Sequence, residues 1–78
     1  MRKKEKRLIV AFSSTHDAMA FEECCMRQGA EGRLIPLPKE ISAGCGLAWS
    51  APLADREHVE ELLRAAGITP QHLRELEV

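Results

Sequence analysis

The chain has 78 residues, of which 45% are hydrophobic and 29% are charged, and its formal net charge is -1 at pH 7. A chain of this length is expected to form one domain, which buries only about 60% of the surface that its unfolded form exposes. The hydrophobic content excludes wholesale disorder, and no apolar run approaches the ~20 residues of a membrane-spanning helix. We therefore expect a soluble protein of the cytoplasm with no membrane partner.

Basic residues are concentrated at the start of the chain. Five of the eleven Lys and Arg residues lie within residues 1–7, so six basic residues stand against eleven acidic ones from Leu8 onward. We predict that residues 1–7 form a flexible basic tail and that residues 8–78 form a single domain. The apolar run after the tail is too short for a signal peptide. The acidic balance of the domain disfavours a nucleic-acid partner.

The three cysteines indicate free thiols. Their number is odd and two of them, Cys24 and Cys25, are adjacent, which is incompatible with an ordinary disulfide framework. The chain has neither a Cys-x-x-Cys nor a His-x-x-x-His spacing, which argues against a structural zinc site. We expect no metal and no cofactor.

The first two elements are predicted to be a strand and a helix. Leu8–Phe12 is a continuous, partly β-branched apolar run, which is typical of a central strand buried on both faces. Ser14 is a candidate N-cap, with Asp17 three residues later as the second half of a capping box. The helix is expected to run from Thr15 to about Gln28, and Gly29 is a natural C-terminal cap.

Helical spacing places several apolar residues of this segment on one face: Ala18, Phe21 and Cys25, flanked by Met19 and Met26. Cys25 is therefore expected to act as a small buried hydrophobe. Cys24 falls at the edge of this face and is expected to be partly exposed.

Two further strands are predicted on either side of a loop. In Leu34–Leu37, the residues Pro36 and Pro38 cannot donate to a hydrogen-bond ladder, so this strand must be short or lie at a sheet edge. Cys45–Ser50 is the third strand, with Leu47 and Trp49 on one side and Ala48 on the other. The sequence is compatible with two positions of Trp49, one in the core and one in an exposed contact patch.

The second half continues with a helix. Asp55 is a plausible cap for Arg56–Ala66, which has an apolar stripe and is ended by Gly67; the stripe is formed by Val59, Leu62, Leu63 and Ala66. His58 faces away from the stripe and is interpreted as solvated. The last segment is ambiguous, because Thr69-Pro70 opens like a helix whereas Leu73–Leu76 suits a closing strand.

With a closing strand, the order of elements is that of a ferredoxin-like βαββαβ fold of the α+β class, an antiparallel sheet with two helices on one face. A right-handed first crossover makes the first two strands parallel, so the loops that leave them emerge at the same end of the sheet. This topology predicts that Gly44-Cys45-Gly46 lies near Ser13, Ser14 and Thr15, at the N-terminus of the first helix.

Such a position suits a reactive cysteine. Gly44 and Gly46 let the backbone take positive φ angles and are expected to leave the Cys45 sulfur uncovered. The helix dipole, free amides and hydroxyl groups stabilise a thiolate, and His16 or Lys39 is a candidate source of positive charge. The same residues also fit a simple helix cap and a tight turn, so sequence physics alone leaves both interpretations open.

Two segments, 12–18 and 34–48, resemble the selenium/sulfur carrier-like family of small bacterial proteins. The most specific part is the Pro-x-Pro of residues 36–38 followed about seven residues later by Cys45-Gly46, and the resemblance runs from Leu8 to Leu76. It implies a ferredoxin-like fold and a role in handling sulfur or selenium, because similar domains occur fused to a sulfur-relay carrier domain of selenium metabolism.

In this resemblance Cys45 matches the family's cysteine, Gly44 and Gly46 give access to it, and Ser14 and Thr15 match the segment that supplies donors. Cys24-Cys25 is not part of the family's pattern. Family members also finish in a more apolar strand than Leu73–Leu76.

Two functions from different classes follow. In the first, Cys45 accepts sulfane sulfur or reduced selenium from a donor protein, holds it as a persulfide or selenosulfide and passes it to an acceptor protein, as a carrier rather than a turnover enzyme. In the second, the domain is a non-catalytic protein-interaction or small-anion-binding module, or a subunit that forms a homo-oligomer through its sheet. A hydrolase is disfavoured because no base and acid accompany the cysteine.

Overall fold

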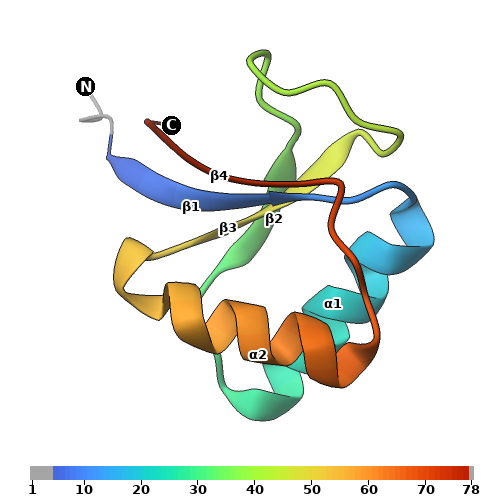
Figure 1. Ribbon diagram of the computed structural model, residues 1–78, viewed down its shortest axis with the longest axis vertical. Helices are drawn as coiled ribbons and strands as arrows, with labels where there is room; N and C mark the ends of the chain where they lie inside the picture. The colour runs from blue at the N-terminus through green and yellow to red at the C-terminus, as the bar shows by residue number, and fades with distance from the viewer. Residues whose placement is uncertain (1–4, 78) are drawn as a thin grey trace.

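The computed structural model describes residues 5–77, and strand β1 (Lys6–Ala11) lies at the middle of their antiparallel sheet. The strand order is β2-β3-β1-β4, with the bounds β2 Arg33–Pro36, β3 Leu47–Ala51 and β4 His72–Glu77. The helices α1 (Thr15–Gln28) and α2 (Arg56–Ala66) both lie below the sheet in Figure 1. The mixed α+β class, the four antiparallel strands and the two helices are confirmed.

Strand β1 is central because its residues are apolar on both sides. Leu8, Ile9 and Val10 are fully buried. Leu8 and Val10 point into the core between sheet and helices, whereas Ile9 and Ala11 belong to a second apolar cluster on the other side of the sheet. We call this other side, away from the helices, the open face.

The strand begins earlier than the sequence indicated. Lys6 and Arg7 were expected in the flexible tail, but they pair with Glu77 and Leu76 of β4. The backbone pairing to β4 extends β1 past its apolar run, because ladder hydrogen bonds do not depend on the side chain. Residues 1–4 of the expected tail lie outside the described residues.

Helix α1 begins and ends where its caps predict. The Ser14 hydroxyl accepts a hydrogen bond from the Asp17 amide at 3.2 Å, and Gly29 ends the helix with a φ of 68°. In place of the second hydrogen bond of the capping box, the Asp17 carboxylate accepts a hydrogen bond from the Ser13 hydroxyl at 3.5 Å. The charge near the helix N-terminus is still favourable for the helix dipole.

Helix α2 begins at Arg56 with Asp55 at the N-cap position, as predicted, but the capping hydrogen bond is missing. Asp55 makes no side-chain cap bond, because the short 3-10 turn Leu53–Asp55 leads directly into the helix. Val59, Leu62 and Leu63 are buried as expected, whereas Ala66 is exposed at the last turn. The helix ends at Gly67, with a φ of 70°.

The core between helices and sheet is built on three aromatic rings. Phe21 of α1 lies 5.7 Å from Phe12 and 5.7 Å from Trp49, with the Trp49 ring edge-on to it. Trp49 is therefore a core residue. Met19 and Met26 flank the apolar face of α1 but remain 56% and 73% exposed, because they point to the solvent side of the helix.

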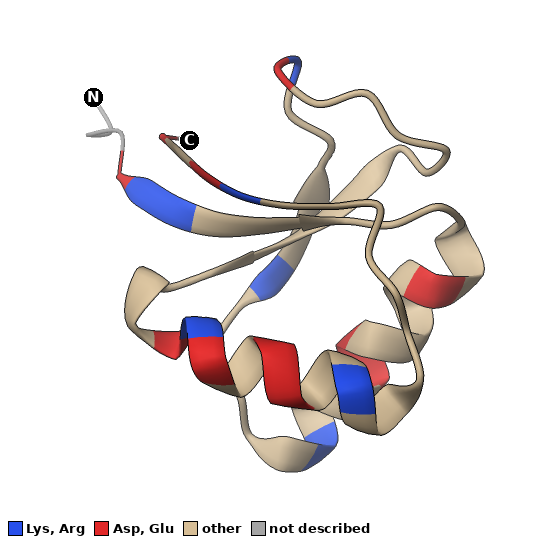
Figure 2. Cartoon of the chain, viewed as in Figure 1, with Lys and Arg blue, Asp and Glu red and all other residues tan. Residues whose placement is uncertain are grey.

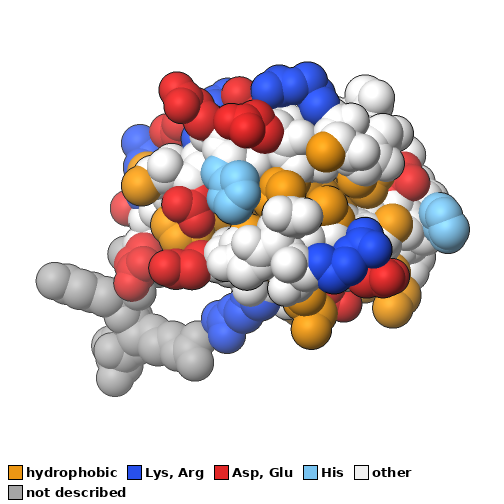
Figure 3. Space-filling view, turned by 90° about the horizontal axis from the view of Figure 1, so that it is seen from below, with side chains coloured by type: hydrophobic (Ala, Val, Ile, Leu, Met, Phe, Trp, Pro, Cys, Tyr) orange, Lys and Arg blue, Asp and Glu red, His pale blue; other side chains and the backbone are white. Residues whose placement is uncertain are grey.

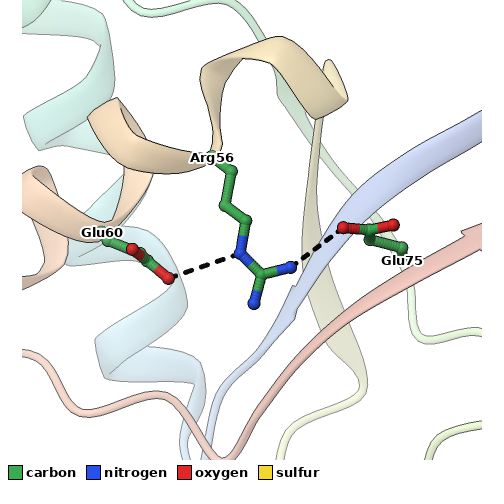
Figure 4. A network of polar contacts seen from close by, with 3 residues as sticks. All are labelled: Arg56, Glu60 and Glu75. Carbon is green, nitrogen blue, oxygen red and sulfur yellow. Dashed lines mark hydrogen bonds and ion pairs between the residues drawn. The ribbon is translucent and has the colours of Figure 1, made fainter.

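The closing segment is a strand, which resolves the ambiguity of the sequence in favour of the strand. Its residues pair with β1 from Lys6↔Glu77 to Ala11↔His72. Arg56 of α2 also contacts this strand, with 3.0 Å between its Nη1 and Glu75 Oε2, and forms a second ion pair with Glu60 at 3.4 Å (Figure 4). Exposed ion pairs of this kind contribute little to stability, so the backbone pairing decides the fold.

The described residues include no helix that is long and apolar enough to cross a membrane. The longest, α1, has 14 residues and a mostly polar outer side.

Candidate functional site

The loop between β2 and β3, residues 37–46, carries Cys45 and is here called the Cys45 loop. Strands β1 and β2 each pair antiparallel with β3, so they run parallel to one another and their outgoing loops lie at one end of the sheet. In Figure 1 this loop rises above the sheet, on the side away from the helices. Ile41 anchors it on the open face, where its side chain is 5% exposed and packs with Ile9 and Ala48.

The end of the Cys45 loop returns to the start of α1, as the topology predicted. A Cβ atom at Gly44 would overlap the carbonyl oxygen of Ser13, so only glycine allows the two backbones to approach this closely. The expected positive φ angles are absent: among the described residues they occur at Gly29, Gly32 and Gly67. Close backbone contact, and not a left-handed turn, is therefore what requires Gly44.

The Cys45 sulfur lies at the N-terminal end of α1. Its Sγ is 3.6 Å from the Thr15 Oγ1 and accepts a hydrogen bond from the Leu47 amide at 3.3 Å. The side chain is not uncovered as expected, because Cys45 is only 2% exposed and belongs to the core cluster. Gly44 and Gly46 are themselves exposed, and the side chain between them points inward.

The predicted donors divide into those that reach the sulfur and those that do not. Thr15 contacts it, whereas the hydroxyl groups of Ser13 and Ser14 are engaged with Asp17. His16 and Lys39 are exposed, and the polar contacts of the Cys45 sulfur within residues 5–77 are with Thr15 and Leu47 alone. Positive charge at the sulfur therefore comes from the α1 dipole rather than from a cation.

Gly46 has a different role from Gly44. Its carbonyl accepts a hydrogen bond from the Leu37 amide at 2.9 Å, which closes the base of the Cys45 loop. A Cβ atom at Gly46 would have no neighbour within 4 Å, so this position opens to solvent next to the cysteine.

Three polar side chains hold the Cys45 loop, one just before β4 and two within it, and the sequence did not indicate them. The Gln71 carbonyl oxygen accepts from the Gly44 amide at 2.9 Å, and the His72 Nε2 lies 2.9 Å from the Ser42 carbonyl oxygen. The Arg74 guanidinium donates to the carbonyl of Glu40 at 3.3 Å. The only available signal was the number of polar residues on a segment whose class was ambiguous.

Loss of these side-chain contacts should expose the cysteine. We expect His72→Ala/Arg74→Ala to raise the rate of Cys45 alkylation up to about tenfold, because two exposed hydrogen bonds that hold the loop are lost. The rate is measured by peptide mass mapping after timed exposure to iodoacetamide. Arg64→Ala on α2, which removes an exposed arginine with no contact to the loop, is the control and should leave the rate unchanged. An unchanged rate in the double variant would show that these contacts do not hold the loop closed.

The two other cysteines lie on α1 and are shielded from chemistry. Cys25 is fully buried, and this burial, together with the neighbouring Cys24, raises the pKa of its thiol to about 12. Cys25 is therefore protonated and non-nucleophilic near neutral pH. Cys24 was expected to be partly exposed but is buried at 9% exposure, because it packs with Cys25 into the core cluster between helices and sheet.

A scan against protein-family models matches residues 7–75 to the family described as "Putative Se/S carrier protein-like". The chain belongs to this family. The match begins within β1, spans α1, β2, the Cys45 loop, β3 and α2, and ends within β4. Searches of curated proteins and of solved structures each returned no match.

Membership in a carrier family has a bearing on the site. A carrier must be loaded and unloaded, so the family implies contact with partner proteins. Of the three thiols in this family member, Cys45 is the one that lies outside a helix, between two exposed glycines and against a helix N-terminus.

Proposed function

We propose that this member of the Se/S carrier family holds one chalcogen atom on Cys45, as a persulfide or a selenosulfide, and passes it to an acceptor protein. The observation that carries the proposal is the position of the Cys45 sulfur between the Thr15 hydroxyl and the Leu47 amide, at the N-terminus of α1. We also assign the domain to the ferredoxin-like class, on its strand order β2-β3-β1-β4 and its element order β-α-β-β-α-β.

The transfer needs no oxidant. The Cys45 thiolate attacks the outer sulfur of a donor persulfide, the sulfur–sulfur bond of the donor breaks, and the donor leaves as a thiolate. The outer sulfur, with its proton, is then bonded to Cys45. Selenium enters in the same way from a donor with a sulfur–selenium bond, and attack by an acceptor thiolate reverses the step. The chalcogen moves between thiols with no net change in oxidation state.

The surroundings of Cys45 suit an anion. When the sulfur is a thiolate, the Thr15 hydroxyl and the Leu47 amide both donate to it, and hydrogen bonds to a charged group are stronger than those to a neutral one. The N-terminus of α1 adds the positive end of the helix dipole. These groups place two hydrogen-bond donors and a helix N-terminus beside the sulfur that reacts.

The burial of Cys45 adds a gating step. With 2% exposure the sulfur is out of reach of a donor, so loading requires the Cys45 loop to move away from α1. This loop is free of regular secondary structure and is held largely by single hydrogen bonds, which is typical of segments that open locally. In the closed state the same burial protects a bound chalcogen from reduction by small thiols.

The experiment is intact mass spectrometry after incubation of the reduced protein with glutathione persulfide. We expect wild-type protein and Cys24→Ala/Cys25→Ala to gain one sulfur atom and Cys45→Ser to gain none, because Cys45 lies on a loop between hydrogen-bond donors whereas the other two thiols are buried on α1. A selenium-bearing analogue of the reagent tests the second cargo in the same three proteins.

Two results would contradict the proposal: no gain in wild-type protein, or a gain that persists in Cys45→Ser and disappears in the α1 double variant. Either result would favour the alternative of a binding module in which the cysteine is structural. Circular dichroism of each variant verifies that the loss is not caused by unfolding.

A further inference from the structure

Charge is divided between the two sides of the sheet. The helices carry six acidic residues and three arginines, and Figure 2 shows the acidic positions along both of them; the acidic residues are Asp17, Glu22, Glu23, Glu57, Glu60 and Glu61. Figure 3 views this helix side, on which acidic and apolar side chains are both exposed. The strand residues that point to the open face include three arginines, Arg7, Arg33 and Arg74. No Asp or Glu of the described strands points to this face.

Strand register places the three arginines across the whole width of the open face. Arg33 of β2 pairs with Ser50 of β3, Ser50 pairs with Ile9 of β1, and Ile9 pairs with Arg74 of β4. Directly paired residues share a face, so Arg33 and Arg74 lie at the two ends of one row, three strand spacings or about 14 Å apart. They occupy the two edge strands of the sheet.

Arg7 fills the space between these two edges and is fixed in place. Its Nε donates to the Ser50 hydroxyl at 3.0 Å, and Ser50 is only 3% exposed. The Arg7 Nη2 also donates to the Ser50 carbonyl at 3.5 Å, so the guanidinium itself is held against β3 and remains partly exposed. The Oε2 of Glu5, which precedes β1, lies 4.0 Å from the Arg7 Nη1, and the Glu5 side chain is 72% exposed, so solvent screens this pair and the open face keeps the positive charge of Arg7.

We propose that the open face is a docking surface for an acidic protein surface, namely that of the donor or acceptor that exchanges a chalcogen with Cys45. The proposal rests on the proposed carrier function. Planar guanidinium groups pair with carboxylates through two parallel hydrogen bonds, which fits them to an acidic protein partner. Ile35 and Leu76 are partly buried in the same face and provide apolar contact beside the charges.

Nucleic acid fits this face less well. Binding of single strands relies on aromatic side chains on which bases stack. All three aromatic residues of the chain, Phe12, Phe21 and Trp49, are buried on the helix side. The excess of acidic residues on the helices also opposes a long polyanion more than it opposes a compact protein.

The docking surface is connected to the Cys45 loop. Arg74 lies on the open face and donates to the Glu40 carbonyl, while His72 of the same strand lies against the Ser42 carbonyl. A partner carboxylate that binds Arg74 competes with the Glu40 carbonyl for the guanidinium. Docking thus weakens the hydrogen bond by which Arg74 holds the Cys45 loop. Opening of the site is in this way coupled to binding of the partner.

The test uses poly-L-glutamate as the probe, titrated into ¹⁵N-labelled protein at low ionic strength. We expect amide shifts in β1, β2, β4 and the Cys45 loop. Arg33→Glu/Arg74→Glu should weaken binding roughly tenfold, because two charge pairs are lost and reversed. Arg27→Glu/Arg64→Glu changes the net charge equally on exposed positions of the helices, and it should weaken binding by less than about twofold.

Shifts confined to α1 and α2, or equal weakening by the two double variants, would overturn the docking surface. Tighter binding of oligothymidine than of poly-L-glutamate at the same salt concentration, lost in the open-face variant, would overturn it in favour of nucleic acid. Sulfur uptake from glutathione persulfide, measured separately, distinguishes this failure from failure of the carrier function. Wild-type protein that binds the probe through the open face but takes up no sulfur contradicts the carrier function alone.

Discussion

Replacing Gly44 with alanine is expected to destabilise the domain and to release Cys45 from its place beside Thr15. A Cβ atom at this position would overlap the carbonyl oxygen of Ser13 and lie 3.3 Å from its carbonyl carbon. Both are backbone atoms at the start of α1, and they cannot rotate aside as a flexible side chain would. The Cys45 loop must therefore shift outward, and overpacking of this kind costs about 1–3 kcal/mol.

Gly46→Ala is the matched control, because a Cβ atom there meets nothing within 4 Å. We expect its free energy of unfolding to stay within about 0.5 kcal/mol of wild type. Urea unfolding followed by circular dichroism gives both free energies, and timed alkylation gives the accessibility of Cys45. Gly44→Ala should show a lower midpoint and faster alkylation. Equal effects of the two substitutions would mean that the contact with Ser13 does not position the loop.

The sequence was sufficient where local patterns and backbone rules decide the structure. The apolar run of Leu8–Phe12 predicted the central strand, and Ser14 and Gly29 predicted both ends of α1. The place of Cys45 near Thr15 followed from chain topology alone, since parallel β1 and β2 bring their outgoing loops together.

These local patterns and backbone rules did not predict the burial of Cys45. Flanking glycines indicate backbone freedom, but the direction of the side chain depends on the path of the whole loop. That path is set by Ile41, which packs against Ile9 on the open face, and by the approach of Gly44 to Ser13. Neither contact has a periodic signal, because the Cys45 loop contains no regular element.

The closing strand shows the same limit. Leu73 and Leu76 are three residues apart, a spacing that suits a helix as well as an irregular strand. Pairing with β1 decides the matter by placing Leu73 opposite Val10 and Leu76 opposite Arg7, on opposite faces of the sheet. Tertiary pairing also brings Arg74 into one row with Arg33, a relation between residues that are 41 positions apart in the chain.

Removal of the Phe21 ring is expected to have the largest effect on stability. Phe21 is fully buried and contacts the rings of Phe12 and Trp49, each with a centroid distance of 5.7 Å. Truncation of a buried phenylalanine to alanine costs about 3–5 kcal/mol, because apolar contact is lost and a cavity remains. Typical domains have only about 5–15 kcal/mol of total stability, and small ones are at the low end. Phe21→Ala should therefore be close to unfolded.

The measurement is urea unfolding by circular dichroism, with Met19→Ala as the control on the exposed side of the same helix. Met19 is 56% exposed, so its truncation should change the free energy of unfolding by no more than about 0.5 kcal/mol. Comparable losses in the two variants would contradict the assignment of the aromatic cluster as the anchor of α1.

Thiol accessibility separates this effect from that of Gly44→Ala. Phe21→Ala weakens the packing of α1 as a whole, so Cys24, Cys25 and Cys45 should all become reactive together through global unfolding. Gly44→Ala displaces only the loop, so Cys45 should react while Cys25 stays protected. Alkylation confined to Cys45 in the glycine variant would show that the loop opens independently of the core, which a gated carrier requires. Joint exposure of all three thiols in both variants would instead make the Cys45 loop part of a single cooperative unit and would contradict gating by local opening.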